Sequence, residues 1–159
     1  MIYPGLYAPS GFDMLSILLR VVQRPNPIYN IGFVDSSCAL VLCALPATED
    51  ESDTPIVYCS DAFSHLTHYQ LPEIVGRNCR FLQSPDGTVN RGEERKHVDS
   101  KHIYDLKLRL RREKETQTRL VNYKKGGEKF INLLTTIEIE WGGDKGRYIV
   151  GFQAQGKDG

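Results

Sequence analysis

Cysteine is the residue type in this sequence with the widest range of possible chemistry. The chain contains four, Cys38, Cys43, Cys59 and Cys79. None belongs to a Cys-x-x-Cys pair or has a histidine at metal-binding spacing, which argues against a structural zinc site and against a disulfide scaffold. A free thiol has a pKa of about 8.5 and is mostly protonated at neutral pH. Because most free cysteines are simply small buried side chains, reactivity must be argued for each one separately.

Side-chain amides on two predicted strands are the second chemical feature. In the segments 129–141 and 147–155, alternation places Asn132 and Gln153 on the same face of a sheet. That face also carries Phe130, Leu134, Thr136, Ile149 and Gly151. A mostly apolar surface with a few polar groups is typical of a ligand site. The opposite face is predicted to be purely apolar and to need a cover: Ile131, Leu133, Ile137, Ile139, Tyr148, Val150 and Phe152.

The elements that position these residues follow from apolar spacing. A helix is expected over 12–22, with Asp13 near its start and the Arg24-Pro25-Asn26-Pro27 segment after its end. Its wide apolar surface makes it the candidate cover for the apolar sheet face. Ser60 can cap a short helix after the second strand. Strands are predicted over 38–45, 56–59, 118–124, 129–141 and 147–155, a loop over 84–92, and a helix through 98–110 whose end also alternates like a strand.

Glycines connect the last three strands, at Gly126-Gly127 and within 142–146, as expected of an antiparallel meander. With two strands near the N-terminus and helices between, the sequence predicts an α+β fold. The length of 159 residues fits one domain, and the composition of 40% hydrophobic and 25% charged residues is that of a globular protein. Lys+Arg and Asp+Glu both number 20, which disfavours nucleic-acid binding. No apolar run or leader suggests a membrane segment, and we expect a cytoplasmic or nuclear protein.

The segment Gly76-Arg77-Asn78-Cys79-Arg80-Phe81-Leu82-Gln83 resembles, residue for residue, the GRNCRFLQ signature of LOV photoreceptors, a flavin-binding branch of the PAS superfamily. The resemblance covers roughly Asn30 to Gln155, and the N-terminal segment resembles the small fungal Vivid/Envoy type. Further matching segments are Tyr58-Cys59-Ser60-Asp61-Ala62-Phe63, Asn122-Tyr123-Lys124-Lys125-Gly126 and Asn132-Leu133-Leu134-Thr135. The resemblance implies a PAS/LOV fold, which is a five-stranded antiparallel sheet with connecting helices and an N-terminal helical cap.

The resemblance also implies roles for individual residues. Cys79 would be the thiol that adds reversibly to flavin carbon C4a after blue light is absorbed. Gln153 would be the amide that reorients when the neighbouring ring nitrogen N5 gains the proton, since an amide can either donate or accept. Arg80 and Arg95 would contact cofactor phosphate. The cofactor contacts would come from Val41, Asn78, Arg80, Gln83, Arg95, Asn122, Asn132, Leu134, Thr136 and Gln153.

Cofactor and partners are implied in the same way. The loop 85–92 resembles an insertion that makes room for an adenine, so FAD is expected, with FMN able to satisfy the core of the site. The resemblance implies a light-dependent homodimer and a White-Collar-type transcription complex as partner, without nucleic-acid, membrane or metal binding. We expect a cap at 1–30 with a hinge at Arg24–Pro27, a flavin-binding core at 31–155 and a tail at 156–159. The cap would move when Gln153 reorients.

Cys59 allows a second interpretation, because it stands immediately before Ser60, where the family commonly has alanine. A thiol near a helix N-terminus has a stabilised thiolate, so Cys59 could be oxidised and report oxidant alongside light. A small packing side chain is the simpler interpretation. Two other classes remain open: a PAS module that only senses oxidant or binds proteins, and a flavin oxidoreductase. The last lacks a Gly-rich dinucleotide motif and a hydride-donor site, so no enzyme activity is expected.

Overall fold

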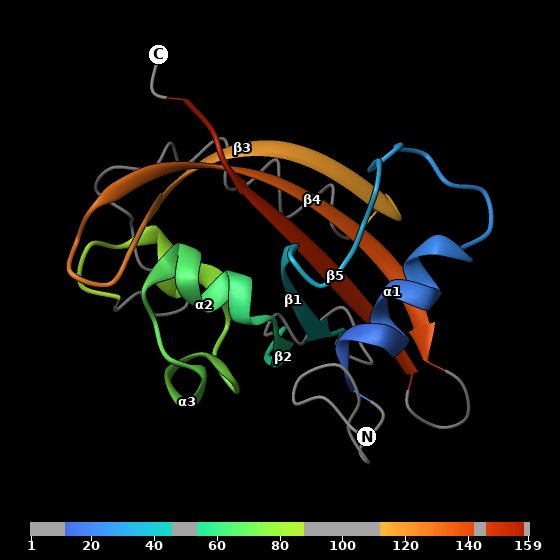
Figure 1. The fold of residues 1–159 in the computed structure, drawn as a ribbon, viewed down its shortest axis with the longest axis horizontal. Helices are drawn as coiled ribbons and strands as arrows, with labels where there is room; N and C mark the ends of the chain where they lie inside the picture. Colours follow the sequence, from blue (N-terminus) through green and yellow to red (C-terminus); the bar gives the residue numbers. More distant parts are fainter. Residues whose placement is uncertain (1–11, 46–53, 88–111, 142–145, 158–159) are drawn as a thin grey trace.

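A five-stranded antiparallel sheet dominates the computed structural model of the protein, which describes residues 12–45, 54–87, 112–141 and 146–157 (Figure 1). The strand order is β2-β1-β5-β4-β3. The strands are β1 (Ala39–Ala44), β2 (Ile56–Cys59), β3 (Glu115–Tyr123), β4 (Lys129–Trp141) and β5 (Gly146–Gln155). The helices are α1 (Met14–Val22), α2 (Asp61–Thr67), α3 (Leu71–Ile74) and the 3₁₀ helix η1 (Cys79–Gln83). The predicted α+β fold is confirmed.

Helix α1 begins where Asp13 caps it, with the carboxylate accepting a hydrogen bond from the backbone N of Ser16 at 2.9 Å. It ends at Val22, as predicted, with Gln23 as its C-cap, and it starts at Met14, two residues later than predicted. Its buried side chains pack on one face of the sheet, here called the outer face, as predicted. The buried residues of this outer cluster are Met14, Ile17, Val21, Leu40, Leu42, Ile137, Ile139, Trp141, Tyr148 and Val150.

The opposite, inner face of the sheet is covered by the helices between β2 and β3. Ser60 caps α2 as predicted: its hydroxyl accepts from the backbone N of Phe63 at 3.2 Å. These helices and the inner face form a second cluster of Val41, Cys43, Ile56, Cys59, Phe63, Tyr69, Ile74, Phe81 and Leu82. In Figure 1, α1 and the pair α2 and α3 lie toward opposite ends of the long strands.

The sheet departs from the sequence prediction in two places. Strand β3 begins at Glu115 rather than at 118, because Glu115 and Thr116 pair with Ile137 and Thr136 of β4. The outer face is not purely apolar, because Thr135 lies on it opposite Phe152. The cover is also partial: Leu133 is 45% exposed, so α1 protects the Ile137–Trp141 end of β4 and leaves the other end open.

Some expectations fall outside the described residues: the helix through 98–110, the loop beyond 87 and most of the turn at 142–146. Among the helices that the structure describes, none is both long and apolar enough to cross a membrane.

Candidate functional site

Three of the predicted amides lie on the inner face of the sheet. Asn122 on β3 and Asn132 on β4 are 3% and 2% exposed, and the Nδ2 of Asn132 donates to the Oδ1 of Asn122 at 2.9 Å. The Nδ2 of Asn122 donates in turn to the backbone O of Val121. The Oδ1 of Asn132 is buried and has no hydrogen-bond partner. A buried polar atom without a partner costs about 1–3 kcal/mol, so this oxygen is a candidate acceptor for a donor on a ligand.

Gln83, at the end of η1, presents the same feature. Its Oε1 is buried and lacks a hydrogen-bond partner. Helix η1 packs against β3, the strand that carries Asn122. Two buried amide oxygens without partners on neighbouring elements fit a ligand whose edge offers hydrogen-bond donors, as a flavin ring does.

Gln153 on β5 is 9% exposed and faces two backbone carbonyls. With its amide nitrogen directed at them, Gln153 donates to the O of Gly151 and the O of Ala39, at 3.1 Å each. The reverse orientation would set the amide oxygen against both carbonyl oxygens, which is repulsive. The favoured state therefore joins Gln153 to β1, on which Ala39 pairs with it, and leaves the amide oxygen as a free acceptor.

Gly151 makes room for this amide, a role that the sequence prediction did not include. A Cβ at Gly151 would lie 3.2 Å from the end of the Gln153 amide that carries its oxygen in the favoured orientation, 3.3 Å from Val41 and 3.5 Å from Leu134. The predicted residues Val41 and Leu134 thus surround the Gln153 amide. A glycine inside a strand marks close approach of another group, and that was the available signal.

Thr136, another predicted site residue, is engaged across the sheet. Its hydroxyl lies 2.5 Å from that of Thr116 on β3, and both side chains are buried. Thr116 was missed because the predicted strand began two residues after it. The pair fixes the β3–β4 register beside Gly151, the β5 partner of Thr136.

The motif around Cys79 forms a capped 3₁₀ turn. Cys79 is the first residue of η1, and the Oδ1 of Asn78 caps it by accepting from the backbone N of Arg80 at 3.0 Å. The Nδ2 of Asn78 donates to the hydroxyl of Thr54, so this predicted cofactor amide has a structural role here. Arg80 is half-buried. The side chain of Cys79 and the whole of Arg95 lie outside what the structure describes.

Arg77 holds this turn in place and was not among the predicted site residues. Its guanidinium lies 4.6 Å above the ring of Phe81 and donates to the backbone O of Gly87 at 2.7 Å. Tyr69 meets Phe81 edge-on at 4.9 Å. Burial raises the pKa of Tyr69, so its hydroxyl is neutral at physiological pH. The arginine–aromatic stack positions η1 and therefore the backbone of Cys79.

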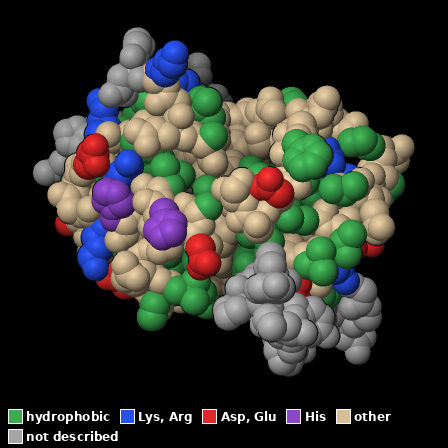
Figure 2. Space-filling model, in the orientation of Figure 1, with side chains coloured by type: hydrophobic (Ala, Val, Ile, Leu, Met, Phe, Trp, Pro, Cys, Tyr) green, Lys and Arg blue, Asp and Glu red, His purple; other side chains and the backbone are tan. Residues whose placement is uncertain are grey.

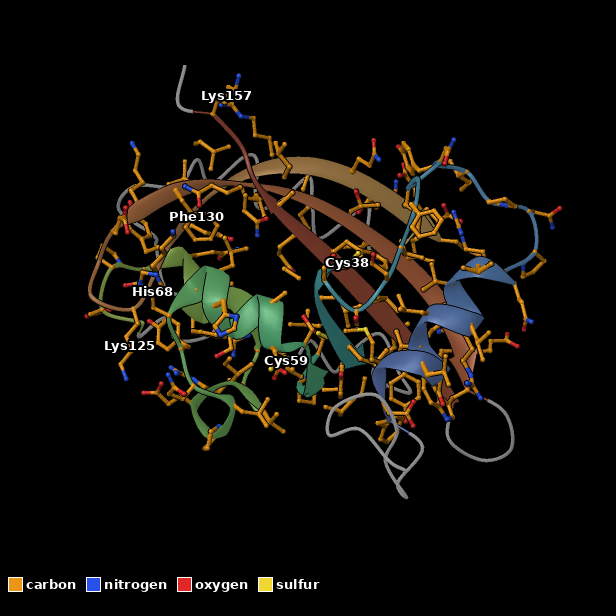
Figure 3. All side chains as sticks on the ribbon, viewed as in Figure 1. Cys38, Cys59, His68, Lys125, Phe130 and Lys157 are labelled. Carbon is orange, nitrogen blue, oxygen red and sulfur yellow. The ribbon has the colours of Figure 1, made fainter. Side chains whose placement is uncertain are left out.

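Cys59 is 3% exposed and belongs to the inner cluster, where β2 meets α2 (Figure 3). It pairs with Val41 of β1. Cys38 is half-buried, and Cys43 is buried. No group of three or more His, Cys, Asp or Glu residues suited to a metal ion occurs among the described residues.

Comparison with known proteins places this site in a family context. A PAS domain model matches residues 43–154. The chain is 48% identical over 151 residues to the blue light receptor lreA of Aspergillus flavus, and 48% identical over 149 residues to the White collar 1 protein of Neurospora crassa. The two matches cover 95% and 94% of this chain, but only 17% and 12% of the two relatives. The chain thus spans less than a fifth of their length.

Two solved structures match over nearly their whole length. One is the light-state dimer of the fungal blue-light photoreceptor Vivid, with 47% identity, a TM-score of 0.80, and coverage of 94% of this chain and 98% of that one. The other is a fungal LOV domain photoreceptor described as integrating blue light and oxidative stress. It shows 38% identity, a TM-score of 0.74 and coverage of 96% and 97%.

Proposed function

This chain belongs to the PAS-domain family, among the fungal LOV blue-light photoreceptors of the Vivid type, and on that premise we propose how it binds a flavin and senses blue light. The flavin ring would lie against the inner face of the sheet, held by Asn122, Asn132 and Gln83. The observation that supports this assignment is the pair of buried amide oxygens without partners, on Asn132 and Gln83. The protein is a sensor and not an enzyme.

The cofactor, when bound, supplies the absorption of blue light and an excited ring that a sulfur nucleophile can attack. Cys79 would provide that sulfur, and its thiol proton would pass to the flavin. Arg77 keeps the turn that bears Cys79 in register by its contacts with Phe81 and Gly87. Positioning of this kind replaces a bimolecular encounter and is the chief contribution of the protein.

Gln153 relays the change to the sheet. In its favoured orientation the amide nitrogen donates to Ala39 and Gly151, and the amide oxygen faces away from them. If the flavin atom facing the amide oxygen gains a proton, it becomes a donor and stabilises this orientation. If that atom is an acceptor, the reverse orientation, with the amide nitrogen toward the flavin, is favoured. Turning the amide therefore makes or breaks two hydrogen bonds at once, one of them to Ala39 at the start of β1. The polypeptide leading into Ala39 comes directly from the cap.

The chain forms a light-dependent homodimer in this proposal, through the cap. Leu15, Leu19 and Val22 lie at i, i+4 and i+7 on the outward side of α1 and are 53%, 48% and 65% exposed. Figure 2 shows hydrophobic side chains on the surface where Figure 1 draws α1. An apolar stripe of this kind needs a partner to be covered. A second copy of the chain would supply one, and the similar photoreceptor Vivid forms a light-state dimer.

We further propose FAD as the cofactor, with FMN as the alternative, and contacts from Arg80 and Arg95 to its phosphates. The similarity to White collar 1 supports a White-Collar-type transcription complex as downstream partner, in the cytoplasm or nucleus. Illumination of the purified protein tests the function. We expect a yellow solution that bleaches in blue light to a single near-ultraviolet band and recovers in darkness. A colourless protein would instead indicate an interaction module, and steady NADH consumption would indicate an oxidoreductase.

Oxidant sensing through Cys59 is a second candidate, favoured by the similarity to a photoreceptor that integrates blue light and oxidative stress. Cys59 directly precedes the cap residue of α2, but burial at 3% exposure limits its access to oxidant. Mass spectrometry after mild peroxide treatment distinguishes the cases. Modification of Cys59 ahead of Cys38 and Cys43 supports the sensor. If Cys59 stays unmodified while Cys38 is oxidised, Cys59 is only a packing residue.

A further inference from the structure

The carboxylate of Glu115, at the start of β3, is 4% exposed and receives its hydrogen bonds from the segment that follows α1. Arg24 donates from Nε at 2.9 Å and from Nη2 at 3.3 Å. The backbone N of Ile28 donates at 3.1 Å and that of Tyr29 at 3.0 Å. One buried side chain of the sheet thus holds both ends of residues 24–29, 86 to 91 positions away in sequence.

Arg24 makes two further hydrogen bonds beside this contact. Its Nη1 donates to the O of Val21 at 2.7 Å, and its Nη2 to the O of Tyr29 at 2.7 Å. The guanidinium therefore joins the last turn of α1, the linker and the sheet. Four hydrogen bonds from the guanidinium hold this largely buried ion pair, and removing either partner leaves the other charge without its counter-charge.

This arrangement changes where the cap can pivot. The sequence predicted a hinge at Arg24–Pro27, but that segment lies between the two contacts with Glu115 and cannot swing while they are made. The next residues are open to solvent: Phe33 is 94% exposed, and Gly32 adopts a left-handed φ of 71°. Motion about residues 30–37 would carry α1 away from the sheet only after the contacts with Glu115 have parted.

We propose that Arg24 and Glu115 form a latch that keeps the cap docked in darkness and must open for α1 to leave the outer face. The inference rests on the proposed function, in which the cap moves in response to light. Arg24 and Glu115 are positioning residues, since neither belongs to the candidate flavin site. The latch sets how easily a change at Gln153 becomes movement of α1.

The chain contains its own reporter for this motion. Trp141 is the only tryptophan and is 5% exposed in the outer cluster. The guanidinium of Arg20 on α1 lies 3.9 Å above its ring, and the ring of Phe12 lies 5.0 Å away. When α1 departs, Trp141 loses both covers and meets water. Its emission maximum and its quenching by acrylamide therefore measure cap docking without reference to flavin absorption.

Glu115→Gln in the flavin-bound protein tests the latch, and Glu138→Gln is the matched control, because Glu138 pairs with the exposed Arg147 at 2.7 Å on the same sheet. In darkness we expect Glu115→Gln to shift Trp141 emission to longer wavelength, increase its quenching and raise the mass measured by light scattering toward a dimer. Glu138→Gln should match the wild type. Bleaching and recovery should persist in both variants, and their loss in the wild type would refute the proposed function instead.

Arg24→Gln and the double variant complete the test. If the two residues form one latch, all three variants show the same dark shift, because the second substitution removes nothing further. Should Glu115→Gln fail to fold, Arg24→Lys keeps the charge but loses the two-pronged contact, and a partial dark shift is expected. Dark emission and mass that equal those of the wild type in folded Glu115→Gln or Arg24→Lys would overturn the latch.

Discussion

The two faces of the sheet differ in how completely their polar groups are satisfied. On the inner face, the amide oxygens of Asn132 and Gln83 are buried without partners. On the outer side, both carboxylate oxygens of the buried Glu115 accept hydrogen bonds, from Arg24 and from two backbone N–H groups. An incomplete network marks a surface that receives a ligand, and a complete one marks a contact between parts of the chain itself. In the proposed function the inner face binds the flavin, and the outer face holds the element that responds.

The largest expected effect on the outer face alone comes from Ile17, which is fully buried between α1 and the sheet. Ile17→Ala should lower the free energy of unfolding by about 2–5 kcal/mol, because it removes three methyl or methylene groups from the outer cluster. Bleaching should survive, since Ile17 has no part in the inner face. Denaturant titration with parallel absorbance measurements checks both parts. Loss of flavin at unchanged cap stability would mean that the two faces are not separate.

Gln153→Leu cuts the connection between the faces. Leucine cannot donate to Ala39 or reorient a hydrogen bond, so the variant should still bleach but dimerise in light about fivefold more weakly, given a net value of about 1 kcal/mol for the lost hydrogen bond to Ala39. Light scattering in darkness and under blue light measures the difference. A light-driven dimer as strong as that of the wild type would show that the signal leaves the inner face by another route.

Lowering the pH is expected to weaken the Arg24–Glu115 contact on the outer side of the sheet. Burial alone would raise the pKa of Glu115, but the hydrogen bonds from Arg24, Tyr29 and Ile28 outweigh it and hold the pKa below its ordinary value of 4.5. The unfolded chain therefore binds the proton more readily, and stability from Glu115 is present above that value and lost as the pH falls below it. Among described residues, Arg24 is the charged group that contacts this carboxylate.

Trp141 emission followed from neutral pH down through pH 4.5 should report this loss as cap undocking. Glu115→Gln removes the titrating group, so its profile should lack the wild-type step. Identical acid profiles for the two proteins would assign the transition to other carboxylates.

His68 provides the smallest expected effect and belongs to neither network. It is the C-cap of α2 with a left-handed φ of 66°, which favours glycine. His68→Gly should raise the free energy of unfolding by about 0.5–1 kcal/mol, the strain relieved less the entropy that glycine adds to the unfolded chain. Thermal unfolding monitored by circular dichroism measures it. A lower melting temperature would show that His68 makes a contact worth more than its strain.

Local pattern was sufficient for the elements whose side chains alternate cleanly. Helix α1, the caps Asp13 and Ser60, and strands β2, β4 and β5 follow from apolar spacing and capping residues close in sequence. The start of β3 does not, because a glutamate reads as solvent-exposed unless its partner is known. Glu115 is buried through Arg24, which the fold brings to it from 91 positions away. No local signal encodes that pairing.

The site shows the same division. Strand alternation placed Asn132 and Gln153 on one face, and Asn122 was identified through the resemblance to the LOV family. The supporting roles of Thr116, Gly151 and Arg77 were missed, since each depends on a neighbour from another element. Cys59 is buried in the inner cluster because β2 pairs with β1, which its position before a helix N-terminus could not reveal.

In the proposed function, Cys79 on η1 is the thiol that reacts with the flavin in blue light, against the inner face of the sheet. Absorbance spectra of Cys79→Ala, taken before and after blue light, test it most directly, with Cys38→Ala as the matched control. We predict that both variants bind flavin, that Cys38→Ala bleaches to a single near-ultraviolet band, and that Cys79→Ala does not bleach to that band. Normal bleaching and dark recovery in Cys79→Ala would show that Cys79 is not the thiol that reacts with the flavin.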